Sequence, residues 1–326
     1  MQSELSIRLN DEGYKNWIKA GFCLQKIRDC LLGFVNTEME KFHHFLLQTN
    51  SLLGQEICKN FCRPQGTKFQ RACFLCEEWK KEILNHHTNQ NNVIYWGNCS
   101  PQLWPNCAWE VAKVYMPRGQ ANRQGPEKSD AAALLNLINS CDQFNFVERQ
   151  KVIEIIKCRN DLMHSVEMRV SAEWLDNCRK KILVLLQEFQ HVPEAKAANK
   201  IIQEIVSSDW RVQITATDEV DALKFTDEEI NAGQIFNAEL ELIREWVEEL
   251  GFTVEEQEAL HLQHLNSLNT FKEFLKQNNE LKSVLHKEIE QLHTLEKKLK
   301  SGKRTVKDQD GEESNLEENE DIKTSS

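Results

Sequence analysis

Apolar side chains recur at intervals of three and four residues through most of this 326-residue chain. This is the spacing of a helix with one buried face, and it covers residues 11–50, 129–140, 146–164 and 171–189. Alternating apolar and polar residues are scarce, and the best strand candidates are residues 92–96 and 210–215. Helix-breaking Gly and Pro are few, at 12 and 6 residues. The sequence therefore predicts an all-α protein built as a helical bundle.

Composition divides the chain into unlike parts. Residues 1–190 are expected to form one helical domain, with an irregular Cys- and Trp-rich insertion over 54–128. Residues 191–256 are expected to be a helical connector, leading to a long helix or coiled coil over 257–300. The last part, 301–326, has no aromatic residue and is rich in Glu, Asp and Ser. Such a composition predicts a disordered acidic tail.

Between residues 260 and 299 the apolar spacing becomes heptad-like. Large apolar residues occupy most a and d positions of this repeat: Leu268, Phe271, Leu275, Leu285, Ile289, Leu292 and Leu299. Asn278 falls at a d position, and Lys282 and Glu296 interrupt the seam. The pattern predicts either a coiled coil that pairs two copies into a homodimer or a long helix folded back on the bundle. The same helix could also bind a partner protein.

Charge is distributed unevenly along the chain. Residues 1–190 carry 24 Lys and Arg against 21 Asp and Glu, whereas residues 191–326 carry 16 against 30. Phosphate affinity comes from clustered Lys and Arg, so any RNA contact is expected in the first half. No run approaches the roughly 20 apolar residues of a membrane span, and residues 1–10 lack the apolar stretch of a signal peptide. We expect an intracellular protein, cytoplasmic or nuclear, with no membrane contact.

The chain has eleven cysteines, which is an odd number, and its start does not read as a secretion signal. Both observations argue against a disulfide framework. Two cysteine pairs, Cys58 with Cys62 and Cys73 with Cys76, have a spacing that could supply four thiolate ligands to a structural zinc. In an alternative zinc site, Cys73 and Cys76 would be completed by ligands from His86, His87 and Cys99. The other interpretation of Cys58 and Cys62 is that they are small core residues on one helix face. A catalytic zinc is not expected, because there is no His-Glu-x-x-His pattern.

The helix predicted over 146–164 carries an arginine on its apolar face. Arg159 lies within an inner stripe made by Val152, Ile155, Ile156, Leu162 and Met163. Losing one member of a buried ion pair costs about 3–5 kcal/mol, so a guanidinium that points inward needs an acidic partner. Glu154 and Asp142 are candidates for that partner. Asn160 and His164, four residues apart, share a face that flanks the stripe. Arg159 and His164 would stand roughly 140° apart around the helix, and could cooperate only near its end or across two subunits.

These three residue types could together cleave RNA without a metal. A histidine can transfer the proton of a 2′-hydroxyl, which typically accelerates a reaction by roughly 10²–10⁴-fold. An arginine can hold the phosphate, and an asparagine can orient either group. The structural alternative is that Arg159 forms an ion pair and His164 caps the carbonyls at a helix end. A Gly-rich phosphate loop and a G-x-S-x-G elbow are both absent, so kinase, NTPase and serine hydrolase functions lack support.

The segment from Arg159-Asn160 to His164 resembles the R-N-x-x-x-H motif of HEPN domains, a helical-bundle superfamily with many RNA-cleaving members. The surrounding sequence is similar to the HEPN domain of the DAZ-interacting-protein-3-like ubiquitin ligases. The segments that carry this likeness are Trp96–Cys99, Trp109–Lys113, Met116–Gly119, Leu134–Cys141 and the helix start at Ser171. The resemblance covers about residues 10–190 and implies a HEPN-like bundle. A RING signature is absent, so ubiquitin transfer is not implied.

The resemblance also implies a function: RNA binding, with metal-independent endoribonuclease activity as a hypothesis. Arg159 would hold phosphate, His164 would transfer the proton and Asn160 would orient them, with no cofactor required. HEPN active sites resemble composites of two Arg–His pairs across a subunit interface, which implies a homodimer. HEPN domains also serve as non-catalytic modules, so the competing expectation is a protein-interaction adaptor. An adaptor should hold Arg159 in a closed buried pair, whereas a nuclease should leave Arg159 and His164 open to a shared cleft.

Overall fold

Helices dominate the computed structural model, which describes residues 4–54, 58–60, 62–88, 93–165, 167–210, 230–256 and 261–310, with side chains left out for 255–264 and 300–310. Within these ranges there is no β-strand, which confirms the all-α prediction. The strand candidate at 92–96 is wrong where it is described, because residues 93–95 are irregular and Trp96 begins a short turn. Residues 211–215, the other candidate, lie outside the described ranges. None of the described helices combines the length and apolar character that a membrane span requires.

The α-helices are α1 (Glu4–Arg8), α2 (Glu12–Thr49), α3 (Phe74–Asn85), α4 (Ala108–Ala112), α5 (Ala131–Ser140), α6 (Arg149–Met163), α7 (Ala172–Leu186), α8 (Pro193–Ser207), α9 (Ala232–Glu256), α10 (His261–Lys276), α11 (Asn279–Val284) and α12 (His286–Asp310). Short 3₁₀ turns lie between them at η1 (Trp96–Asn98), η2 (Pro101–Leu103), η3 (Lys113–Tyr115), η4 (Pro126–Lys128), η5 (Asp142–Phe144) and η6 (Gln187–Phe189).

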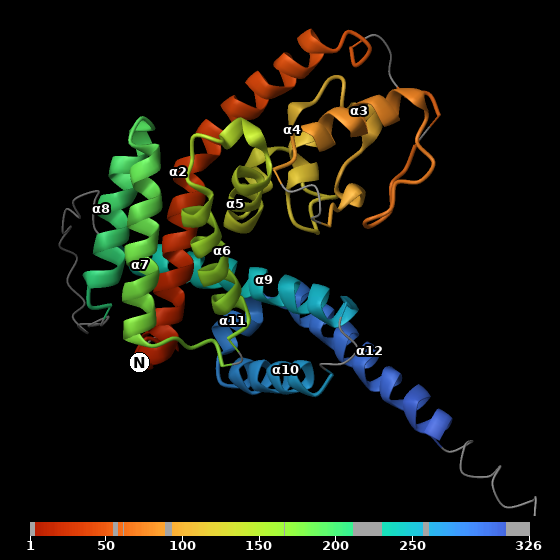
Figure 1. Ribbon diagram of the computed structural model, residues 1–326. Helices are drawn as coiled ribbons and strands as arrows, with labels where there is room; N and C mark the ends of the chain where they lie inside the picture. The colour runs from red at the N-terminus through yellow and green to blue at the C-terminus, as the bar shows by residue number, and fades with distance from the viewer. Residues whose placement is uncertain are drawn as a thin grey trace, which may run out of the picture.

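Helix α2 is the spine of the molecule, and α4 to α9 all pack against it (Figure 1). Its N-terminus is capped by Asp11, whose carboxylate accepts a hydrogen bond from the Tyr14 backbone N–H at 3.1 Å. Its fully buried residues include Trp17, whose indole N–H donates to the Leu162 carbonyl of α6 at 3.0 Å. Complete burial of one large apolar side chain stabilises the fold by about 1.5–3 kcal/mol, so this single helix organises the core.

Two helix starts in the bundle lie where capping residues predict them. Asp130 accepts a hydrogen bond from the Ala133 N–H at the start of α5, and Ser171 accepts one from the Trp174 N–H at the start of α7. Figure 1 shows α7 and α8 along one flank of α2, with α5 and α6 on the other. Pro193 stands at the first turn of α8, where its missing N–H leaves no bond unmade.

The insertion between α2 and α5 has its own small aromatic core. Trp79, Trp96, Trp104 and Phe69 lie with ring centroids 5.8–6.4 Å apart, as aromatic rings in cores usually do. All four are buried, so these tryptophans pack inside the protein and do not offer rings to a ligand.

Helix α9 brings the C-terminal part of the chain onto α2. The two helices cross closely at Gly21, where an added Cβ would lie 2.5 Å from a methyl carbon of Leu242. Buried polar contacts reinforce the packing: Glu239 of α9 accepts hydrogen bonds from Arg8 at 2.6 and 2.7 Å and from the Tyr14 hydroxyl at 2.8 Å. The acidic half of the chain is therefore part of one packed body with the first half.

The prediction of one long helix or coiled coil over 257–300 needs correction. Residues 261–300 instead form α10, α11 and the start of α12, with a break at Gln277 and Asn278. Asn278 is buried, accepts a hydrogen bond from Arg8 and donates one to the Phe274 carbonyl. It therefore lies at the end of α10 and does not occupy a position in a coiled-coil seam. The predicted seam residues are buried or half-buried within this one chain, with α12 packing along α9.

Helix α12 extends away from the body in Figure 1 and continues to Asp310, ten residues into the segment predicted as a tail. Residues 311–326, the rest of that segment, lie outside the described part of the chain.

Candidate functional site

Helix α6 places Arg159 on the buried side of the bundle, as its spacing predicts. Val152, Ile155 and Leu162 on the same stripe are fully buried, and Arg159 itself is only 7% exposed. The guanidinium forms an ion pair with Glu249 of α9, with Nη1 2.9 Å from Oε2. The partner of Arg159 is therefore a carboxylate 90 residues away.

The two partners expected from the sequence are engaged elsewhere, so that expectation is wrong. Glu154 pairs with Lys157 and Lys181, and these contacts lower its pKa to about 2. Asp142 accepts from the His86 imidazole at 2.9 Å.

The three motif residues do not share one space. Arg159 and Asn160 line a cavity between α6 and α9, and the Asn160 side chain is otherwise exposed. His164 is exposed at the C-terminus of α6, where its backbone N–H bonds to the Asn160 carbonyl at 2.9 Å, and it does not line the cavity. A single chain, in the part that the structure describes, therefore does not bring Arg159 and His164 together around one substrate atom.

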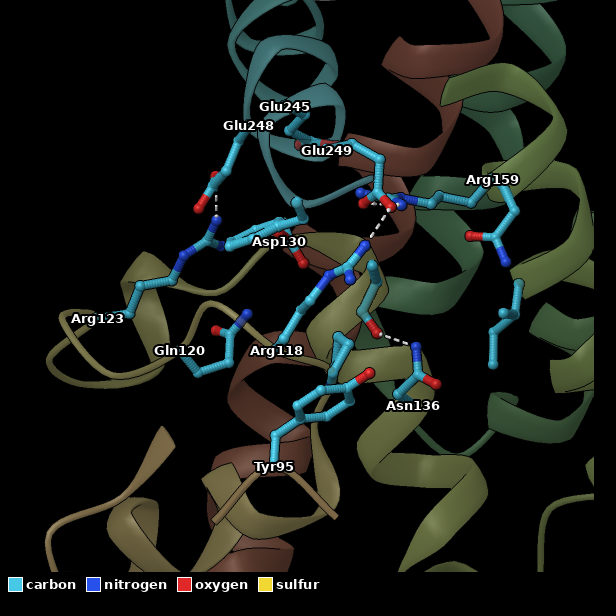
Figure 2. Close-up of a pocket in the computed structure, with 15 residues that line it drawn as sticks. Tyr95, Arg118, Gln120, Arg123, Asp130, Asn136, Arg159, Glu245, Glu248 and Glu249 are labelled. Atoms are coloured by element: carbon cyan, nitrogen blue, oxygen red, sulfur yellow. Dashed lines mark hydrogen bonds and ion pairs between the residues drawn. The ribbon is translucent and has the colours of Figure 1, made fainter. Parts of the chain in front are cut away.

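The cavity has a volume of about 240 Å³ and is lined mainly by charged and polar side chains. Arginines enter it from α6 and from the loop after η3, and carboxylates from α9 and the start of α5 (Figure 2). The charged lining residues are Arg118, Arg123, Arg159, Asp130, Glu245, Glu248 and Glu249. Tyr95, Gln120, Asn136 and Asn160 add uncharged polar groups, and Phe252 an aromatic ring.

Ion pairs connect every arginine in this cavity to a carboxylate. Glu249 reaches Arg118 as well as Arg159, with Oε1 3.6 Å from the Arg118 Nη2. Arg123 pairs with Asp130 at 2.8 Å and with Glu248 at 2.7 Å. Figure 2 shows these side chains pointing toward one another across the cavity. The α9 carboxylates therefore take the places that an external anion would need.

The loop that carries two of these arginines is held in shape. Asn98 accepts a hydrogen bond from the Gln120 N–H at 3.1 Å and donates one to the Pro117 carbonyl at 2.8 Å. Gly119 has φ +94°, and an added Cβ would lie 2.5 Å from the Phe252 ring. Only glycine fits a positive φ and so close an approach. Phe252 also lies beneath the Arg118 guanidinium, 5.0 Å from its centroid, so the loop and α9 fit together closely.

Burial and charge shift two protonation equilibria in the cavity. Burial acts to lower the pKa of Arg159, but the charges of Glu249 and Asp130 outweigh it and raise the pKa above its usual value. Burial raises the pKa of Glu245 to about 8, and the negative charge of Asp130 adds to the effect. At neutral pH the Glu245 carboxyl is therefore mostly protonated and uncharged, whereas Arg159 stays charged.

A second cluster lies in the insertion. The sulfur atoms of Cys58, Cys62, Cys73 and Cys76 all lie within 4.8 Å of one another, so this set could bind a metal ion. The alternative set is not assembled, because His86 bonds to Asp142 and the Cys99 thiol to the Trp96 carbonyl.

A family model described as "Domain of unknown function (DUF4559)" matches residues 8–315 of the chain. The chain belongs to this family. It is 45% identical over 310 residues to the Mus musculus protein named "Uncharacterized protein CXorf38 homolog", and the match covers 94% of this chain and 96% of that protein. No solved structure matches the chain. The DUF4559 match includes both α6 and α9, so both walls of the cavity belong to one family domain.

Sequence reasoning missed the acidic wall of this DUF4559 cavity. Glu245, Glu248 and Glu249 follow one another at i, i+3 and i+4, which places three carboxylates on one face of a helix. This spacing was the available signal. Arg118 and Arg123 lie in a loop that also carries Lys128, and nothing in their spacing relates them to Arg159.

Proposed function

We propose that this DUF4559 chain is a non-catalytic interaction module built on a HEPN-like bundle. The observation that carries the proposal is the closed ion pair between Arg159 and Glu249. A nuclease of the HEPN type would need its arginine free to hold a phosphate beside the histidine that transfers the proton. Here a carboxylate takes the phosphate's place, and His164 lies outside the cavity.

Charge in the cavity supports the same proposal. The carboxylates of Asp130, Glu248 and Glu249 face the three arginines, so the lining offers little net positive charge to RNA. RNA affinity depends on neutralising successive phosphates with Lys and Arg. A polyanion would have to displace carboxylates before it could reach any arginine.

The deciding experiment is an RNA cleavage assay in EDTA with a panel of single-stranded and hairpin RNAs. Wild type, Arg159→Ala and His164→Ala are compared, with His44→Ala as a control because His44 is an exposed histidine on α2. Circular dichroism and sedimentation check folding and oligomeric state. We expect no cleavage by the folded wild type. Cleavage that Arg159→Ala and His164→Ala both lose, and His44→Ala retains, would refute the proposal.

A second candidate is RNA binding with a composite endoribonuclease site formed by two copies of the chain. It is favoured by the exposure of both Asn160 and His164 at one end of α6, where a second copy could approach. In such a homodimer, an Arg159→Ala copy mixed with a His164→Ala copy would recover part of the activity that each lacks alone. The absence of recovery, in an assay where wild type cleaves, would exclude the composite site.

We also propose that the four-cysteine cluster holds a structural zinc. Zn–S bonds of about 2.3 Å in a tetrahedron separate sulfur atoms by about 3.8 Å. The Cys58 and Cys73 sulfurs lie 3.7 Å apart, which fits this geometry. The Cys73 backbone N–H also donates to the Cys62 sulfur at 3.2 Å, as it would to a thiolate ligand. Such a zinc would join the chain before α3 to the start of α3 and stabilise the insertion.

A further inference from the structure

We propose that Arg118, Arg123 and Arg159 form a binding site for a single phosphate group on a peptide, which Glu248 and Glu249 keep closed in the free protein. The inference rests on the proposed interaction function and names the chemistry of its partner. The ligand class is a phosphorylated side chain, and the two α9 carboxylates act as intramolecular competitors for it.

The three guanidinium groups converge on one cavity from separate parts of the chain. Arg159 comes from α6, and Arg118 and Arg123 come from the loop after η3 (Figure 2). Asn98 and Gly119 hold that loop in a defined shape against α9. Clusters of arginine placed in advance by the fold are the usual means of recognising phosphorylated peptides, because each guanidinium can donate two parallel hydrogen bonds.

Arg159 has hydrogen-bonding capacity that its present partner does not use. Its side chain is only 9% exposed, and its Nε–H has no hydrogen-bond partner in the described part of the chain. A buried donor without a hydrogen-bond partner is unfavourable. A phosphate carries three acceptor oxygens and could satisfy both Nε and Nη of Arg159, whereas Glu249 bonds only Nη1.

The α9 carboxylates stand where the phosphate would bind. Glu249 lies between two arginines, 2.9 Å from Arg159 and 3.6 Å from Arg118, and Glu248 lies 2.7 Å from Arg123. Their side chains are 20% and 42% exposed, so both can rotate into solvent. The rest of α9 need not move, because buried residues such as Trp246 and Leu242 anchor it.

Charge balance fits one phosphate. Once Glu248 and Glu249 rotate away, Asp130 alone faces the three arginines as an ionised carboxylate, because Glu245 is mostly uncharged at neutral pH. The excess is then two positive charges. A phosphorylated side chain carries a charge of about −1.5 to −2 at pH 7, which matches this excess.

A peptide fits the surroundings better than RNA does. The cavity volume of about 240 Å³ admits one phosphorylated side chain but not a strand. The groove beside it has mixed charge, with Glu127 and Glu241 next to Arg28, Lys128 and Arg244. RNA affinity comes from successive phosphates that each meet Lys or Arg, and the carboxylates between these basic residues interrupt such a row. A peptide brings a single phosphate and can place side chains of either charge opposite the mixed charges of the groove.

The test is isothermal titration calorimetry on the full chain with three probes. These are a capped Gly-phosphoserine-Gly tripeptide, its unphosphorylated twin and an oligouridylate RNA. The proteins are wild type and a double variant, Glu248→Gln with Glu249→Gln, which keeps side-chain size and removes the competing charge. We expect the phosphorylated tripeptide to bind the double variant at least about tenfold more tightly than wild type, and its twin not to bind.

Matched variants separate the site from general charge effects. Glu173→Gln removes one charge from an exposed position on α7, outside the cavity and the groove, and should leave the wild-type affinity unchanged. Arg159→Lys, added to the double variant, keeps the charge but loses the paired donors, and should weaken binding at least about tenfold. Arg149→Gln, at an exposed position on the same helix, should not. Thermal unfolding checks that each variant is folded.

Three results would overturn the proposal: no binding of the phosphorylated tripeptide by the folded double variant, equal binding of the unphosphorylated twin, or tighter binding of RNA than of the tripeptide. These results are independent of the cleavage assay. Metal-independent RNA cleavage would refute the non-catalytic function whatever the tripeptide does. Absence of tripeptide binding, with no cleavage, would remove the phosphate site and leave the non-catalytic function intact.

Discussion

Arg8 and Glu239 form a buried ion pair, with the guanidinium Nε and Nη2 donating to the two carboxylate oxygens at 2.6 and 2.7 Å. The residues are 231 positions apart, on α1 and α9. Arg8 also donates to Asn278, at the break between α10 and α11. One side chain near the N-terminus therefore fixes the position of three C-terminal helices, including the helix that closes the arginine cavity.

Removing one member of this pair should destabilise the fold strongly. Glu239→Ala leaves the Arg8 guanidinium buried without its counter-ion, so we expect a loss of about 3–5 kcal/mol in the free energy of unfolding, measured by urea denaturation. The control is Arg244→Ala, which breaks a more exposed pair with Glu288 and should cost less than about 1 kcal/mol. Similar losses for the two variants would show that the buried contact contributes nothing special.

Stability should depend on pH through Glu245. Its pKa is raised to about 8 in the folded protein from an ordinary value of 4.5. The contribution of this carboxyl to stability is therefore fully present below pH 4.5. It is lost as the pH rises from 4.5 through 8, because the folded protein then has to hold a buried charge. Glu245→Gln, which is always neutral, should raise the melting temperature at pH 8.5 by about 2–4 °C relative to wild type. The difference between the two proteins should shrink toward pH 5, and an equal difference at both pH values would contradict the assignment.

Two glycines of α2 should respond in opposite directions to alanine. At Gly21 the new methyl group would meet the Leu242 side chain, with an ideal Cβ 2.5 Å from its nearest atom, so we expect a loss of about 1–3 kcal/mol. At Gly33 a Cβ meets nothing within 4 Å, and Gly33→Ala should stabilise the helix by about 0.5–1 kcal/mol. Urea denaturation measures both. If Gly21→Ala also stabilised the protein, the close crossing of α2 and α9 would be wrong.

Zinc content should depend on the four-cysteine cluster. Purified wild type should contain about one zinc per chain by mass spectrometry of the metal, and a chelator should lower its melting temperature. Cys76→Ser should lose the metal and become insensitive to the chelator. Cys30→Ser, at a buried cysteine outside the cluster, should keep the metal. A metal-free wild type whose melting temperature ignores the chelator would rule out the zinc.

Local features of the fold were predictable because they depend on neighbours in the sequence. The helix starts at Asp130 and Ser171 follow from side chains that cap the next turn. The burial of Arg159 follows from its place on an apolar stripe. The four cysteines were grouped by spacing, and the fold brings their sulfur atoms together.

Features that depend on distant contacts were not predictable. The heptad pattern of the C-terminal part is compatible with a partner chain, yet the structure buries it within the same chain, where Asn278 ends α10 by binding Arg8. The candidate site shows the same limit. Its spacing identified Arg159, but its neighbours Glu154 and Asp142 were the expected partners, and the actual partner is on α9.

The sequence by itself determined the helical class, the inward direction of Arg159 and the grouping of the four cysteines, because periodicity and spacing act within a few helical turns. Only the tertiary structure decided that Arg159 faces Glu249, that Arg118 and Arg123 join it, and that His164 stays outside the cavity. The physical reason is that an ion pair is selected by proximity in the folded chain. That proximity is set by how α9 packs on α2, through Leu242 over Gly21 and Glu239 on Arg8.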